Sequence, residues 1–259
     1  GVRGSIPSPG ASTCRWGGNT SCISVEHEDL PPLIFDCGTG ARALGEALIR
    51  LPGRKLDLFF SHFHIDHVIG FPFFLPIFTP GYEIGVTMPG FSEDDARDKI
   101  ARYLNGVFHP VRLRELPANL NFSHIRPGMT VHRGEYEVVT LRLNHPGGSI
   151  GYRVNVGGKS VAYVTDTAPF AKFGEGVTFD EEATVRERNV ISFLSGCDIV
   201  VYDTMYDKEE YIKKMTWGHS YPEYAHKLCG KAAVKHLVLF HHNPSSDDDT
   251  LDAREAYWS

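Results

Sequence analysis

The sequence lacks several features that would restrict its location. No run approaches the roughly 18 consecutive apolar residues of a membrane-spanning helix, so we expect no membrane contact. The first nine residues hold no apolar stretch of the kind found in secretory signals, and we expect a cytoplasmic location. The five cysteines form no C-x-x-C pair, and their odd number suits a reduced interior better than a disulfide framework.

Concentrated basic charge is also missing. The formal net charge is −6, and no long run of Lys or Arg occurs. Binding to a nucleic-acid backbone needs a concentrated basic face, so we expect a small-molecule substrate and consider a large RNA an unlikely partner. No internal repeat, low-complexity segment or linker divides the 259 residues, which predicts a single domain over residues 1–259. A homodimer is left open.

Apolar periodicity predicts strands interleaved with helices. A continuous apolar run over 56–60 has the length of a strand, and apolar residues three or four apart over 41–51 predict a helix. Further helices are expected at 93–104, 181–194 and 221–229, and further strands at 21–26, 33–36, 136–143, 151–156, 161–164, 199–202 and 236–240. Sheets covered by helices, and hence an α/β architecture, follow from this alternation.

The segment directly after the apolar run 56–60 concentrates metal-ligand side chains, namely His62, His64, Asp66 and His67. In extended geometry His62 and His64 project to the same side and could bind one ion. A turn at Ile65 would bring Asp66 and His67 toward a second ion. Imidazole and carboxylate are the usual ligands of catalytic zinc. Scattered surface histidines do not explain this density, so the segment predicts a metal centre.

Further ligand candidates stand at the ends of other predicted strands. His145, Asp166, and either His241 or His242 each follow an apolar run. A single strand-end His or Asp is often only a turn or capping residue. Because the pattern repeats at three strand ends, we expect these side chains to converge on one edge of a sheet. His241 is preferred to His242 because it follows its strand directly.

The ordered set His62-x-His64-x-Asp66-His67, His145, Asp166 and His241 resembles the metallo-β-lactamase superfamily of dinuclear hydrolases, over essentially the whole chain. The resemblance implies an αββα sandwich, in which two mixed β-sheets are flanked by helices. It implies that His62, His64 and His145 hold one metal, that Asp66, His67 and His241 hold a second, and that Asp166 bridges them. Two Zn²⁺ ions are expected, with Mn²⁺ or Fe as alternatives. A metal-bridging hydroxide would be the nucleophile, oriented by Asp66, because two ions lower the pKa of a shared water from 15.7 toward roughly 7.

Later segments resemble one branch of that superfamily. Asp203-Thr204-Met205-Tyr206 and Trp217-Gly218-His219-Ser220 are similar to the phosphodiesterase branch that includes ribonuclease Z. In that branch a His at the position of His219 donates a proton to the leaving oxygen, a role worth roughly 10²–10⁴ in rate. The alternative is a structural His219 packed against Trp217. Ser220 is expected to cap the following helix together with Glu223.

The length of the segment between His145 and Asp166 bears on the substrate class. Branch members that process transfer RNA carry a Gly/Pro-rich arm between the positions of His145 and Asp166, where this chain has only twenty residues. We therefore predict a metal-dependent hydrolase, a phosphodiesterase that acts on a small phosphodiester such as a cyclic nucleotide. Alternatives are a hydrolase of lactones, β-lactams or thioesters, and a ribonuclease Z-like RNA endonuclease. Residues 168–195 are open to interpretation as a lid, whose Phe170, Phe173 and Phe179 could stack on a base.

Overall fold

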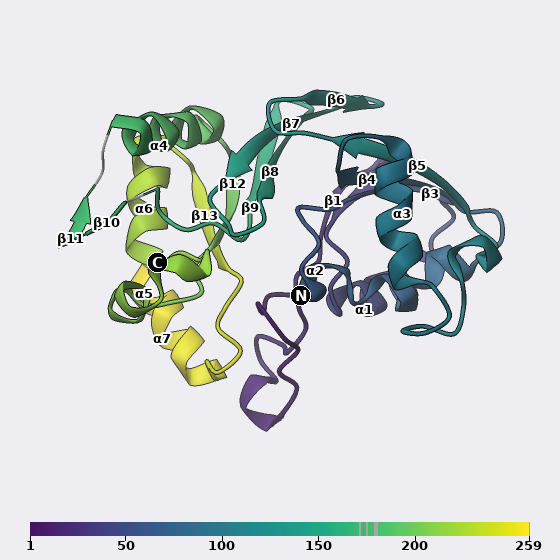
Figure 1. Cartoon of the computed structure of the whole chain (residues 1–259), viewed down its shortest axis with the longest axis horizontal. Coiled ribbons are helices and arrows are strands. Elements are labelled where there is room, and N and C mark those ends of the chain that lie inside the picture. The colour runs from purple at the N-terminus through teal and green to yellow at the C-terminus, as the bar shows by residue number, and fades with distance from the viewer. Residues whose placement is uncertain (171, 175, 179–180, 259) are drawn as a thin grey trace. The chain divides into compact units, whose positions relative to one another are not determined.

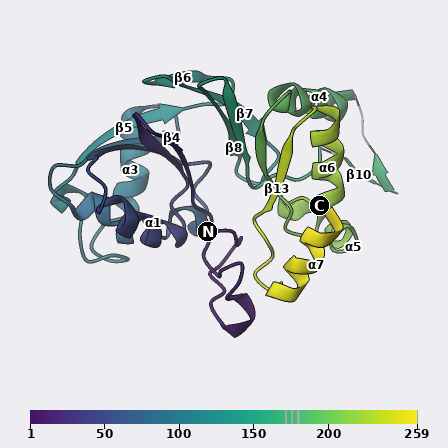
Figure 2. The ribbon, with the colours of Figure 1, turned by 180° about the vertical axis from the view of Figure 1, so that it is seen from behind.

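The structure is a computed structural model that describes residues 1–258 apart from 171, 175 and 179–180. The chain divides into two compact units, Gly1–Arg126 and Pro127–Ser259, which we call the N-terminal unit and the C-terminal unit. Each unit is described by itself, and its elements can be followed in Figure 1 and, from behind, in Figure 2.

The N-terminal unit is built on a five-stranded mixed sheet with the order β1-β2-β3-β4-β5. β1 pairs with β2 in antiparallel fashion, whereas β2 to β5 are parallel. The strands are β1 (Ile23–His27), β2 (Leu30–Phe35), β3 (Lys55–Phe59), β4 (Glu83–Pro89) and β5 (Asn119–Ile125). The helices are α1 (Gly40–Leu48), α2 (Ile65–Val68) and α3 (Glu93–Tyr103). α3 lies against β4 and β5.

Buried apolar side chains explain the elements of this unit. Leu58 of β3 lies opposite Val86 of β4, and both are buried in the core. α1 buries the face that carries Ala41, Gly45 and Leu48, a helical spacing of three to four residues. The predicted helix over 41–51 and strand over 56–60 are therefore present, with small differences at their ends.

The C-terminal unit contains a six-stranded mixed sheet with the order β13-β12-β9-β8-β7-β6 and a separate hairpin, β10-β11. Its strands are β6 (Thr130–Arg133), β7 (Tyr136–Leu143), β8 (Ser149–Val156), β9 (Lys159–Val164), β10 (Lys172–Gly174), β11 (Gly176–Thr178), β12 (Ile199–Asp203) and β13 (His236–Phe240). Its helices are α4 (Glu181–Leu194), α5 (Lys208–Lys213), α6 (Pro222–Lys231) and α7 (Asp248–Trp258). α4 and α6 lie side by side, and α6 also contacts β12 and β13 (Figure 2).

Four strands of this sheet run in the same direction, so their C-terminal ends lie along the same side of the sheet. β9, β12 and β13 are parallel, with Val164 opposite Tyr202 and Asp203 opposite Phe240. β7 runs in the same direction as β9, because two antiparallel pairings, β7–β8 and β8–β9, separate them. The residues at or directly after these strand ends therefore gather at one edge, and they include His145, Asp166, Asp203 and His241.

The predicted start of the helix after Trp217 needs a correction. α6 begins at Pro222, and its N-cap residue is Tyr221, so the prediction that Ser220 caps this helix with Glu223 is wrong. Proline at the first helical position has a preset φ and lacks the N–H that a cap would serve, which shifts the helix start by one residue. Ser220 is instead buried, and its carbonyl oxygen accepts a hydrogen bond from the Tyr206 N–H (3.1 Å).

Among the described residues, no helix combines the length and the apolar character that crossing a membrane requires.

Asp198 forms hydrogen bonds at the N-terminal ends of β9, β12 and β13, opposite to the strand ends that carry Asp166, Asp203 and His241. Its Oδ2 accepts a hydrogen bond from the Ser160 N–H (2.8 Å), and its Oδ1 accepts one from Lys235 Nζ (2.7 Å). Its carbonyl oxygen accepts from the His236 N–H (3.0 Å). These contacts join the beginnings of β9, β12 and β13. The Lys235 ammonium, followed by the Ser160 amide, lowers the pKa of Asp198 from 3.8 to about 2.

We expect the stabilisation by Asp198 to be complete above about pH 4 and to be lost as the pH falls toward about 2. The folded state holds the ionised carboxylate more strongly than the unfolded state does, so protonation favours unfolding. The difference in free energy of unfolding between the wild type and Asp198→Asn should therefore narrow across that interval in urea titrations. Glu28→Gln, on the exposed β1–β2 turn, is the control and should show no such narrowing. A difference that stays constant over the whole interval would contradict this role.

Candidate metal centre

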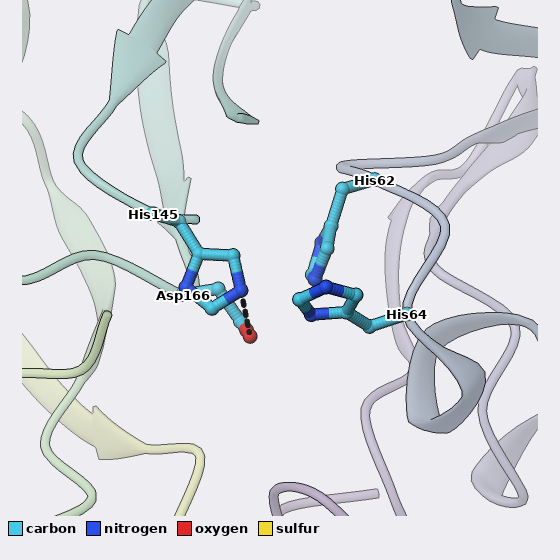
Figure 3. Close-up of side chains that lie close together, drawn as sticks. All are labelled: His62, His64, His145 and Asp166. Carbon is cyan, nitrogen blue, oxygen red and sulfur yellow. Dashed lines mark ion pairs between the residues drawn. The ribbon is translucent and has the colours of Figure 1, made fainter. Parts of the chain in front are cut away.

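The motif after β3 forms two neighbouring pairs of ligand-type side chains in the N-terminal unit. His62 and His64 follow the strand, His64 in extended conformation, and their ring centroids are 4.5 Å apart (Figure 3). Ile65 then begins α2, as the predicted turn required. Asp66 and His67 lie on α2, and Asp66 Oδ2 is 3.2 Å from His67 Nε2. His62, Asp66 and His67 are buried, whereas His64 is exposed.

Asp36 forms hydrogen bonds with the motif that follows β3. Its Oδ2 accepts a hydrogen bond from His67 Nδ1 (2.7 Å) and another from Ser61 Oγ (2.7 Å), while its Oδ1 accepts from the Ser61 N–H (2.7 Å). Ser61 Oγ in turn lies 3.0 Å from His62 Nδ1. Because both rings use Nδ1 for these bonds, Nε2 is the ring atom that would bind a metal, an orientation that supporting carboxylates provide in metal sites. The backbone amide of Ser5 also donates to Asp66 Oδ2 (2.8 Å).

Asp36 is a residue whose role the sequence analysis missed. It directly follows β2 and is buried, with a φ of +58° in the left-handed region that non-glycine residues rarely adopt. Such strain is concentrated at functional sites. The available signal was the same one that identified the other candidates, namely a carboxylate that directly follows an apolar strand.

Asp166 lies between two histidines of the C-terminal unit. Its Oδ2 is 3.6 Å from His145 Nε2, the ion pair drawn in Figure 3, and its Oδ1 is 3.1 Å from His241 Nε2. Thr165 Oγ1 also donates a hydrogen bond to Oδ1 (2.7 Å). One carboxylate oxygen therefore faces each imidazole, the arrangement that a bridging ligand needs. His241, the preferred candidate, thus contacts Asp166.

Gly218 fixes the ring of His145. The carbonyl oxygen of Gly218 accepts a hydrogen bond from His145 Nδ1 (2.9 Å), so that Nε2 faces Asp166. Gly218 has a φ of +85°, and a Cβ atom at this position would lie 2.3 Å from His145 Nδ1 and 2.4 Å from Pro146 Cδ. Only glycine meets both conditions, since other residues would be strained and would clash with the histidine.

His219 is buried beside these residues and is oriented by Asp203. His219 Nδ1 lies 2.8 Å from Asp203 Oδ2, which also accepts from the Thr167 N–H (3.1 Å). The His219 ring stacks on that of His241, with centroids 5.0 Å apart, and lies 5.2 Å from that of His145. Asp203 belongs to the motif Asp203-Thr204-Met205-Tyr206, but sequence patterns alone indicated no role for it. Asp203 and His219 also come within 4.8 Å of Asp166 and His241, so distance alone would allow them to act as ligands.

Trp217, two residues before His219, is 61% exposed, and its ring contacts the Lys214 ammonium, 5.3 Å from the ring centroid. The alternative in which His219 is a structural residue packed against Trp217 stays a hypothesis. The ring centroid of Tyr206 lies 5.9 Å from that of His219. Burial raises the pKa of the Tyr206 phenol, which keeps it protonated.

The donor distances within each unit fit a zinc-type ion. Two ligands of a tetrahedral zinc ion, each about 2.0–2.1 Å from the metal, lie about 3.3 Å from one another. The donor pairs of Asp66 with His67, of Asp166 with His241 and of Asp166 with His145 are separated by 3.2, 3.1 and 3.6 Å. Nitrogen and oxygen donors at these separations, with Nδ1 of His67 and of His145 hydrogen-bonded, have the chemistry that the metals require.

The predicted lid over 168–195 includes three phenylalanines, two of which lie among the described residues. Phe170 is partly buried and packs against the core cluster of the C-terminal unit, with the Arg186 guanidinium 6.0 Å from its ring. Phe173 belongs to β10, and Phe179 lies outside the described residues. Phe170 is thus a packing residue, and the lid stays a hypothesis.

Known proteins resemble this chain along nearly its whole length. The family model described as "Beta-lactamase superfamily domain" matches residues 33–242. The ribonuclease Z of Picrophilus torridus is 24% identical over 99% of this chain and 88% of its own, and that of Myxococcus xanthus is 26% identical over 92% and 87%. Among solved structures, the metallo-beta-lactamase fold protein YhfI from Bacillus subtilis aligns with a TM-score of 0.67 at 18% identity, over 99% of this chain and 89% of its own. The short form of human tRNase Z aligns with a TM-score of 0.65 at 20% identity, over 94% and 91%.

These comparisons overturn one prediction. The interpretation that a large RNA is an unlikely partner is wrong, because the relatives matched over nearly the whole chain are named ribonucleases, and one neighbour is named for transfer RNA. The prediction relied on the short segment between His145 and Asp166 and on net charge. Net charge describes the whole chain and says nothing about how charges are distributed around a site.

The other main predictions agree with the findings. Two mixed sheets with their helices, together with the structural neighbours, confirm the metallo-β-lactamase αββα fold class. The family confirms a metal-dependent hydrolase. The chain belongs to the metallo-β-lactamase superfamily, in its ribonuclease Z-like branch.

Proposed function

We propose that the chain hydrolyses phosphodiester bonds of RNA in the manner of a ribonuclease Z. The observation that carries the proposal is the buried His219, held by Asp203 within the cluster of Asp166 and His241, where it can protonate a leaving oxygen. The names of the sequence relatives support RNA as the substrate. A carbonyl substrate such as a lactone would have less need for this arrangement, since its leaving group does not depend on a placed acid.

The proposal includes a dinuclear centre and a single domain over residues 1–259. The family model, which matches residues 33–242, supports both. We assign His62, His64 and His145 to one metal, Asp66, His67 and His241 to the other, and Asp166 to a bridge between them. Zinc suits the imidazole and carboxylate donors best, with manganese and iron as alternatives. When bound, two such ions make water nucleophilic at neutral pH and neutralise the charge that develops on the phosphate.

The residues of the chain then supply orientation and a proton. Asp203 holds His219 through Nδ1 and stabilises its imidazolium form, so that Nε2–H can be donated to the departing alkoxide. Asp36 and Gly218 fix the rings of His67 and His145 through their Nδ1 atoms. Each of these supports is a buried or backbone group, which keeps the site organised before substrate binds.

A small phosphodiester such as a cyclic nucleotide is the second candidate substrate, and one observation favours it. β8 ends at Val156 and β9 begins at Lys159, so the two strands are joined by Gly157 and Gly158 alone. Both glycines have positive φ values, as a tight hairpin turn requires. The described residues therefore carry no arm at this point, where transfer-RNA-processing members of the branch have one.

The substrate is tested by turnover of a panel with the metal-loaded protein: a precursor transfer RNA, a short single-stranded RNA, 3′,5′-cyclic AMP, a lactone and a cephalosporin. We expect cleavage of the RNA substrates with the highest kcat/KM, because the ribonuclease relatives match the chain along its whole length. Preference for cyclic AMP would favour the second candidate. Turnover of only the lactone or the cephalosporin would contradict the proposal of a phosphodiesterase.

His219→Ala should lower kcat for an RNA substrate by roughly 10²–10⁴-fold, because the alkoxide leaving group would lose its proton donor. Bis(p-nitrophenyl) phosphate should be affected far less, since nitrophenolate leaves without a proton. Asp203→Asn should also lower kcat more for RNA than for bis(p-nitrophenyl) phosphate, but by a smaller factor. Steady-state kinetics on both substrates provide the measurement, and equal losses on the two would contradict a general-acid role.

Removal of metal with a chelator should abolish turnover, and added Zn²⁺ or Mn²⁺ should restore it. Elemental analysis is expected to find two ions per chain in the wild type and a clear deficit in Asp166→Ala, because the shared carboxylate is lost. His132→Ala, which changes an exposed histidine of β6, is the matched control and should retain both ions. Full activity in a sample without transition metal would end the proposal.

A further inference from the structure

Trp217 is a large aromatic residue left in solvent next to the proposed proton donor. It closes a short 3₁₀ turn, Met215–Trp217, two residues before His219. Its side chain is 61% exposed, whereas His219 and Ser220 are buried. Single exposed apolar residues are common on protein surfaces, so exposure alone gives Trp217 no function. Trp217 differs from such residues in two respects: it lies two residues before His219, and neighbouring groups hold its ring in place.

The Trp217 ring is held in place by a braced lysine. Lys214 Nζ lies 5.3 Å from the Trp217 ring centroid and 4.9 Å from that of Tyr206, so the cation contacts both rings. Glu210 Oε1 pairs with Lys214 Nζ at 2.6 Å and also accepts a hydrogen bond from Asn243 Nδ2 (3.1 Å). Glu210 therefore links Lys214 to the loop that follows His241, and Lys214 supports one face of the Trp217 indole.

The backbone of the turn is equally constrained. The Trp217 N–H donates a hydrogen bond to the Lys214 carbonyl oxygen (2.9 Å). The next residue, Gly218, is tied to His145 through its carbonyl oxygen. A side chain on a turn that is anchored at both ends loses little further freedom when a ligand stacks on it, which makes it a pre-organised contact.

Resting on the proposed phosphodiester hydrolysis, we infer that Trp217 is a stacking platform for the base of the nucleoside whose oxygen leaves. In an in-line displacement the nucleophile and the leaving oxygen lie on opposite sides of the phosphorus. His219 must stand on the leaving side in order to protonate that oxygen. Trp217 belongs to the same anchored turn, so its exposed face meets the leaving nucleoside. Stacking on an indole accepts any base, because every base has a π-face.

The test compares two short RNA substrates for the metal-loaded enzyme, one with a normal base and one with an abasic ribose on the leaving side. Trp217→Ala should raise KM for the base-bearing RNA by roughly 10- to 100-fold, the range expected for one lost stacking contact, with little change in kcat. The abasic substrate should show the same KM in wild type and variant. Trp217→Phe should retain most of the affinity. Phe91→Ala, which removes an aromatic that is 81% exposed in the N-terminal unit, is the control and should change neither value.

The outcomes separate the platform from the proposed function. Equal KM increases on both RNAs, or no increase on either, would overturn the stacking role while leaving phosphodiester hydrolysis intact. If the wild type cleaves neither RNA, the proposed function fails, and binding of 5′-AMP then tests the platform directly. We expect 5′-AMP to quench Trp217 fluorescence in a variant with Trp16 and Trp258 changed to Phe. Absence of quenching at saturating nucleotide would overturn the inference.

Discussion

The parallel register of β9, β12 and β13 determines where the chemistry of the C-terminal unit is located. Strands that run side by side in the same direction end at the same edge, and ligands in open α/β sheets bind at such carboxyl ends. Asp166, Asp203 and His241 occupy these ends. β7 delivers His145 to the same edge through its two antiparallel neighbours. The hydrogen bonds of the sheet thus place side chains that are almost a hundred residues apart in the chain, and Asp198 secures the other end of the same strands.

Three strand ends turn sharply at the residue that carries the functional side chain. Asp36, Asp166 and His241 have φ values of +58°, +48° and +56°, a conformation with a cost for residues other than glycine. The cost is offset by the bonds that these side chains make. Asp36 accepts three hydrogen bonds from the motif after β3, and Asp166 accepts one from Thr165. Strain at three ligand-bearing or ligand-supporting positions is therefore part of how the site is organised.

The turn from Trp217 to His219 combines three tasks within three residues. Gly218 positions His145, His219 is placed by Asp203, and Trp217 stands in solvent. The small space around Gly218 allows no side chain, so the turn can approach His145 closely without displacing it. The proposed proton donor and substrate contact on one rigid turn keep a constant separation, which helps to orient the substrate.

The amino-acid sequence by itself determined the candidate ligand types, their order and most of the secondary structure. Apolar runs marked β3, β7 and β13, and the density of imidazoles after β3 predicted a metal centre, because spacing and side-chain chemistry are local properties. Only the tertiary structure decided the contacts of Asp36, Asp203 and Gly218 with histidine rings, the contact of His241 with Asp166, and the exposure of Trp217. These depend on hydrogen bonds between residues far apart in the chain and on strand register, which composition and periodicity do not specify. The partner prediction failed for a related reason: net charge sums over the chain, whereas recognition depends on where the groups lie.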